Sequence, residues 1–243
     1  ALQLFAGLPF GPEPREFLAW FLHGGGQKAF EKLYQRRNIH ALACGLTIPG
    51  GGWFKSQVSA PADFKGLNVA AAGLASKVLA KLGVEPALFA AGDIRQALKQ
   101  GSVAGALVSL PSADLSLEIQ REAKNYYFPG WQHQAGVLEL LINLERWRAL
   151  GREQQTRIRQ VCVANLGASL AAGEAAQFGA LKQLVLDGVE VRRWSPEMIK
   201  ALGNAWSAVL ADEIARDKDF KRIWKGLKEF RTDYAIWREL GYL

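Results

Sequence analysis

The sequence predicts an α/β protein with a largely helical C-terminal region. Short apolar runs alternate with helix-period segments between residues 67 and 108, and this alternation is typical of βαβ units around a parallel sheet. From residue 146 onward, apolar side chains instead recur every three or four residues, as they do on helices. The chain has 243 residues, 49% of them hydrophobic. It is therefore long enough to bury a core without a disulfide framework or a structural metal.

The βα region is punctuated by residues that start or stop helices. Gly83 and Gly101 each follow a helix-period segment, where a glycine commonly ends a helix. Asp93 is placed to cap the second helix at its N-terminus. The expected strands are, in order, 67–71, 87–89 and 103–108, with helices over 74–82 and 93–98 between them.

The later elements follow the same two periods. Residues 137–142 read as a strand, and 189–191 form another strand after the Asp187-Gly188 turn. An apolar face over 158–170 predicts a helix. Ser195-Pro196 marks a further helix start, since serine caps and proline favours the first helical position. Aromatic and aliphatic residues continue that period to Trp237, which indicates core-facing helices.

Several function classes lack support in the sequence. The net charge of +7 is spread over helical faces that also carry acids, and no nucleic-acid-binding signature accompanies it. No apolar run reaches the roughly 18 residues of a membrane span. The three histidines have no metal-binding spacing, and no nucleophile or carboxylate pair stands out, so we expect no catalysis, metal or cofactor. Cys44 and Cys162 read as small core residues, and their pairing stays open.

Aromatic residues outside helical stripes are the best lead to a binding site. Phe10, Trp53 and Trp131 all lie next to glycine at expected loops or strand ends. Ligands of open α/β sheets bind beyond the carboxyl ends of strands, where aromatic walls suit a small molecule. We therefore expect these side chains to line a cleft, the alternative being packing beneath a loop.

The motifs taken together resemble one family over essentially the whole chain. The segments GLNVAAAGL (66–74), VLAKLGV (78–84) and GDIRQALKQG (92–101) are similar to those of TRAP transporter solute-binding proteins, the DctP-like P subunits. YYFPGW (126–131) followed by VLELLIN (137–143) resembles the branch that includes 2-oxoacid receptors. LPFG (8–11) and GGWFK (51–55) fit the same branch. Members of the family carry a further segment before the Pro-Phe-Gly motif, so we expect that part of the first lobe to be missing here.

The polar ligand positions of the family differ in this chain. Ala70 stands where the family has an arginine that pairs with the substrate carboxylate, and Leu107-Val108 replaces Glu-Trp. Pro49 replaces a glutamine that helps to hold a metal ion in the oxoacid branch, and Gln132 replaces a histidine. The ligand-binding residues expected from this comparison and from the aromatic pattern are Phe10, Trp53, Ala70, Leu107, Val108, Trp131 and Gln132.

The resemblance implies a two-lobe, periplasmic-binding-protein type of α/β fold with parallel or mixed sheets flanked by helices. We expect residues 1–20 and 106–145 to form part of lobe I, 21–105 and 146–200 to form lobe II, and the helices of 201–243 to pack across the lobes. The implied function is capture of a small, neutral or largely apolar ligand in the interlobe cleft for TRAP-type permease subunits. The implied location is the periplasm or the outer face of the cytoplasmic membrane, and we expect a monomer. The alternative is a scaffold or sensor that has lost ligand binding.

Overall fold

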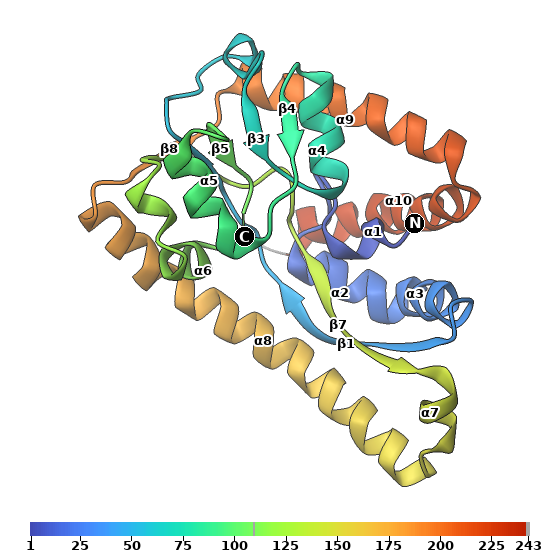
Figure 1. Cartoon of the computed structure of the whole chain (residues 1–243). Helices are drawn as coiled ribbons and strands as arrows, with labels where there is room; N and C mark the ends of the chain where they lie inside the picture. The colour runs from blue at the N-terminus through green and yellow to red at the C-terminus, as the bar shows by residue number, and fades with distance from the viewer. Residues whose placement is uncertain (109, 242–243) are drawn as a thin grey trace.

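The computed structural model describes residues 1–108 and 110–241, so the last two residues of the helical segment predicted over 201–243 lie outside the described part. It is a mixed α/β fold in which helices flank two sheets (Figure 1). One sheet is an antiparallel pair, β1 (Ile39–Thr47) with β7 (Gly136–Asn143). The other has six strands in the order β4-β3-β5-β2-β6-β8, which are Glu85–Ala87, Asn68–Ala70, Gly105–Ala106, Gly52–Phe54, Asn125–Phe128 and Glu190–Arg193.

The predicted βα units are confirmed, with shifted edges. Strands β4, β3 and β5 are parallel, and the helices between them are α4 (Gly73–Lys81) and α5 (Ile94–Gln100). Gly83 and Gly101 take positive φ values of 83° and 74°, as residues that follow a helix often do. Strand β4 lies two residues before the predicted 87–89, because its parallel register pairs Glu85 with Asn68. The side chain of Asp93 makes no capping hydrogen bond, so that expectation was wrong.

Strand β2 lies inside the six-stranded sheet and runs antiparallel to both of its neighbours, β5 and β6. This pairing joins strands from the predicted segments 21–105 and 106–145 in one sheet. The sheet therefore crosses the boundary that we placed at 105/106. Local periodicity does not reveal which distant strands pair, so nothing in the sequence signalled this crossing. The lobe boundaries themselves stay a prediction.

The helices account for most of the remaining chain. Ser195 caps α9 through its hydroxyl, which accepts from the Met198 amide at 3.1 Å, so this start is confirmed. The long helix α8 runs past the β1–β7 pair as far as α7 (Figure 1). The Cys44–Cys162 disulfide joins α8 to β1 and settles the pairing that the sequence left open. The helices not yet given bounds are α1 (Gln3–Ala6), α2 (Pro14–His23), α3 (Gly26–Gln35), α6 (Pro111–Ser116), α7 (Leu144–Ala149), α8 (Arg152–Leu186), α9 (Pro196–Arg216) and α10 (Lys218–Leu240), with short 3₁₀ turns at Pro61–Phe64, Ala91–Asp93 and Ile119–Arg121.

Two apolar cores lie around the six-stranded sheet. The larger core contains α2, α3, α4, α9 and α10 side chains, including Trp20, Phe30 and Trp206. The smaller core contains Trp53 and Tyr126 and lies toward α5 and the end of α8. No helix among the described residues is both long and apolar enough to cross a membrane.

Candidate functional site

A cavity of about 360 Å³ lies where several chain segments leave their strands. This volume is at the lower end of the range for small-molecule sites. Segments following β1, β3 and β5 meet there with α1 and with the loop between β6 and β7. The lining residues are Gln3, Ala6, Gly7, Thr47, Ile48, Gly50, Ala72, Gly73, Leu74, Ala75, Leu107, Val108, Leu110, Gln132 and His133.

The cavity wall is mainly aliphatic and carries no charged side chain among the described lining residues. The larger aliphatic side chains of the lining are those of Ile48, Leu74, Leu107, Val108 and Leu110. The polar side chains are those of Gln3, Thr47, Gln132 and His133. Such a lining favours apolar ligand surface, and it offers no opposite charge to a buried ion.

The N-terminus of α4 forms one side of the cavity. Residues Ala72 to Ala75, the cap and first turn of this helix, all line it. Ala72 has no side chain that can cap the helix, so the first-turn amides are left to other partners. The positive end of the helix dipole also lies here, so this side of the cavity favours an oxygen acceptor.

His133 was missed by the sequence reasoning, although it lines the cavity and is hydrogen-bonded on both sides of its ring. Its Nε2 atom lies 2.6 Å from the Thr47 hydroxyl oxygen. The ring also hydrogen-bonds to the Ala6 backbone, and a Cβ on Gly7 would lie 2.4 Å from its Nδ1 atom. Burial lowers the pKa of His133, an effect only partly offset by the bond to Ala6. The neutral imidazole thus ties α1 to the end of β1. A lone histidine without a spaced partner carries no signal in sequence.

Three of the seven predicted site residues line the cavity. Leu107 and Val108 follow β5, and Gln132 lies in the β6–β7 loop. The Gln132 Nε2 atom donates to the Gly51 carbonyl at 2.9 Å, which fixes the orientation of its amide. Whether these residues bind a ligand stays a prediction, but the structure brings them together.

Trp53 and Ala70 lie in the core instead of lining the cavity. Trp53 is fully buried and stacks on Tyr126, with ring centroids 3.9 Å apart. Its Nε1 atom and the Tyr126 hydroxyl each donate to Asp114 at 2.8 Å. Burial, and then the Asp114 carboxylate, raise the pKa of Tyr126 far above its usual value, which keeps the phenol a donor. Ala70 is also buried in the smaller core, because its position within β3 directs it there.

Phe10 and Trp131 pack against each other on the larger core. Their rings stack with centroids 6.1 Å apart, and the Phe10 amide donates to the Trp131 carbonyl at 2.8 Å. Trp131 is 2% exposed and belongs to that core, while Phe10 packs against it. Neither lines the cavity, so the alternative of packing beneath a loop describes both. Glycine beside an aromatic residue is compatible with either placement.

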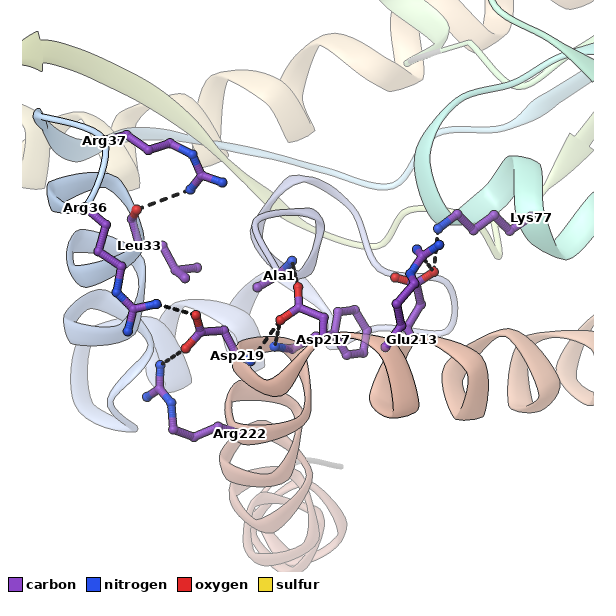
Figure 2. A network of polar contacts seen from close by, with 11 residues as sticks. Ala1, Leu33, Arg36, Arg37, Lys77, Glu213, Asp217, Asp219 and Arg222 are labelled. Carbon is purple, nitrogen blue, oxygen red and sulfur yellow. Dashed lines mark hydrogen bonds and ion pairs between the residues drawn. The ribbon is translucent and has the colours of Figure 1, made fainter.

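A second, polar groove lies beside α1 and is lined by side chains of α4 and α9 and by residues at the junctions with α3 and α10 (Figure 2). Its charges are largely paired within the groove. Figure 2 shows Arg36 and Arg222 both directed at Asp219, and Lys77 directed at Glu213. The cations of Lys77 and Arg216 together lower the pKa of Glu213 against the opposing effect of burial. This network links helices; Arg36, Lys77 and Arg216 are engaged by acids, and Arg37 donates to the Leu33 carbonyl.

Comparisons with known proteins identify the family to which the chain belongs. The model of the bacterial extracellular solute-binding proteins, family 7, matches residues 2–217. A monocarboxylate 2-oxoacid-binding periplasmic protein of Nostoc is 31% identical over 245 residues, which cover all of this chain and 67% of that protein. The chain therefore spans about two thirds of this relative's length.

Two solved structures share both the fold and appreciable sequence identity. A TRAP transporter solute-binding protein from Bordetella bronchiseptica has a TM-score of 0.94 at 32% identity, covers 98% and 71% of the two chains, and holds copurified calcium and picolinate. A TRAP periplasmic solute-binding protein from Colwellia psychrerythraea has a TM-score of 0.93 at 27% identity and holds calcium and pyruvate. The match covers 98% of this chain and 73% of that one. This chain belongs to the family 7 bacterial extracellular solute-binding proteins, the solute receptors of TRAP transporters.

Proposed function

We propose that the cavity captures a small, uncharged and largely apolar solute for a TRAP-type transporter. The observation that carries this proposal is the aliphatic lining, in which no described residue contributes a charged side chain. An apolar ligand body gains about 25 cal/mol for each Å² of surface removed from water. The first-turn amides of α4 favour a carbonyl or hydroxyl oxygen at one end of the same ligand.

A small carboxylate fits this cavity less well. The relatives from Bordetella and Colwellia hold picolinate and pyruvate, both with calcium. Here Ala70 and Leu107 occupy the positions that resemble the family's arginine and glutamate, and Ala70 is buried outside the cavity. A buried carboxylate without a paired cation costs several kcal/mol, whereas a helix N-terminus returns about 0.3–1 kcal/mol.

The cavity's donor set does not fit calcium either. Calcium prefers six to eight oxygen ligands, with carboxylates among them. The described lining contains only the side-chain oxygens of Gln3, Thr47 and Gln132, and the Thr47 hydroxyl is engaged by His133. We therefore assign no metal to ligand capture.

Family membership also suggests where the protein works and with which partners. We infer a periplasmic or membrane-anchored receptor that acts as a monomer, delivers its ligand to permease subunits and catalyses no reaction. The Cys44–Cys162 disulfide suits an oxidising compartment of this kind.

Thermal unfolding with a matched ligand series tests the ligand class. The series is 4-methylpentanamide, methyl 4-methylpentanoate and 4-methylpentanoate, which share one branched tail and differ in the polar end, with pyruvate plus calcium as the family-type ligand. A ligand at 100 times its Kd adds about 2.7 kcal/mol to stability. For a chain of this size that raises Tm by about 5–10 °C. We expect a rise with the two uncharged compounds and none with the two acids.

A pair of leucine variants assigns the effect to the cavity. Leu107→Ala removes apolar wall and should weaken binding of 4-methylpentanamide about tenfold. Leu88→Ala is the matched control, because Leu88 is 80% exposed and lies outside the cavity. A shift with pyruvate and calcium would refute the proposal. Absence of any shift, together with native mass spectra free of a copurified small molecule, would favour the scaffold or sensor alternative.

A further inference from the structure

One face of α8 contacts β1 and α6, two elements whose flanking residues line the cavity, through a series of residues at regular spacing. Successive members lie three or four positions apart, so they share one face of the helix. The part of the series near α7 contacts β1, and the part near the six-stranded sheet contacts α6. The members are Cys162, Asn165, Ser169, Gly173 and Gln177.

The first contacts hold a bulge in β1. The register of β1 against β7 shifts between Ala43 and Gly45, which makes Cys44 the extra residue. Cys44 is joined to Cys162, and its carbonyl accepts from the Asn165 side-chain amide. The Leu46 amide donates to the Ser169 hydroxyl at 2.9 Å. The backbone of β1 around the bulge is therefore hydrogen-bonded to α8 side chains.

The next contacts reach the cavity walls. Ile48 lines the cavity just after β1, and a Cβ on Gly173 would lie 3.4 Å from its Cδ1 atom. One turn further on, the Gln177 Oε1 atom accepts from the Ser112 amide at 3.0 Å. The Gln177 Nε2 atom donates to the Ser112 hydroxyl at 3.1 Å. Ser112 follows Leu110 by two residues, and Leu110 lines the cavity. The same helix face thus supports both Ile48 and the Leu110 segment.

We propose that this face of α8 is a strut that sets the separation of two parts of the cavity wall, the one at Ile48 and the one at Leu110. The Cys44–Cys162 disulfide is its redox-sensitive end, and the contact of Gln177 with Ser112 is its cavity end. A dithiol reductant that converts the disulfide to two thiols, and is itself oxidised to a disulfide, loosens the Leu110 wall. The consequence for ligand capture rests on the proposed function, whereas the strut itself is testable in ligand-free protein.

Hydrogen exchange at the Ser112 amide, followed by NMR, tests the strut. In the C44A/C162A variant this amide should exchange about fivefold faster or more, as expected for coupled elements. Cys162 lies about 22 Å along the helix from Gln177, so a local effect of the disulfide does not reach Ser112. Gln177→Leu should accelerate the same amide directly, and removing the disulfide from that variant should add nothing further.

Gln183→Leu is the matched control on the same helix. The Gln183 side chain donates to Asp187 at 2.8 Å, outside the series, so its loss should leave Ser112 exchange unchanged. If C44A/C162A does not fold, wild-type protein in dithiothreitol and the Asn165→Leu variant give the same readout. Acceleration confined to β1, with Ser112 as protected as in the wild type, overturns the proposal. No ligand enters these measurements, so failure of the ligand series does not affect them.

Discussion

Asp114 holds the segment that follows the cavity wall, and its removal should be costly. The side chain is fully buried and accepts from Trp53 Nε1 and from the Tyr126 hydroxyl, each at 2.8 Å. Asp114→Ala leaves both donors in the core without this acceptor. A buried unsatisfied donor costs about 1–3 kcal/mol, so the two together predict a loss of about 2–6 kcal/mol in the free energy of unfolding.

Urea denaturation of four variants and one control variant measures this loss and locates its origin. Asp114→Asn keeps an acceptor oxygen and should cost less than Asp114→Ala. Tyr126→Phe removes one donor, so Asp114→Ala made in that background should cost about 1–3 kcal/mol less than it does alone. Asp212→Ala is the control, because Asp212 is 66% exposed and pairs with Lys81 at the surface.

Two results would refute the reasoning about Asp114. The first is a loss below about 1 kcal/mol in Asp114→Ala, which would mean that the indole and phenol find other partners. The second is strict additivity with Tyr126→Phe, which would mean that the two groups do not share a hydrogen bond in solution.

Three further stability predictions follow from single contacts. Burial lowers the pKa of both His133 and His40, so the free energy of unfolding should be highest above pH 6.5 and fall as the pH drops below that value. His133→Gln should flatten part of this pH dependence in thermal melts, and an unchanged dependence would contradict the prediction. Arg231→Met leaves the buried Glu16 carboxylate without its 3.0 Å partner and should cost about 3–5 kcal/mol in urea unfolding, whereas less than 1 kcal/mol would argue against a buried ion pair. Ser195→Ala should cost about 1 kcal/mol through the lost cap of α9, and Ser195→Asp should retain most of that stability.

The sequence was most informative where structure is decided locally. The βα units between residues 67 and 108 rest on periodicity and on glycines that end helices, and both are properties of a few neighbouring residues. The helix start at Ser195 is another local signal. The disulfide depends on the approach of residues 118 positions apart, and the place of β2 depends on pairing with strands more than 50 residues away. No local pattern encodes either approach.

For five of the seven predicted site residues, position relative to a strand end separates the cavity wall from the core, whereas Phe10 and Trp131 lie outside strands and still pack on the larger core. Leu107, Val108 and Gln132 lie beyond their strands and line the cavity, as expected for ligand sites at the carboxyl ends of strands. Trp53 and Ala70 lie inside strands, so sheet pairing and the adjoining core fix their side chains.

The same rule identifies the residues that the sequence reasoning passed over. Ala72 and Gly73 begin just beyond β3, and Ile48 just beyond β1, and all three line the cavity. Counting outward from the predicted strand 67–71 would have found Ala72 and Gly73. No strand was predicted over β1, so Ile48 and the paired Thr47, which also lines the cavity, gave no such signal. Residue type was the weaker guide: aromatic rings attracted attention, yet small and aliphatic residues form the walls. That composition underlies our proposal of an uncharged solute, since backbone amides at the start of α4 would supply the polarity that charged side chains otherwise provide.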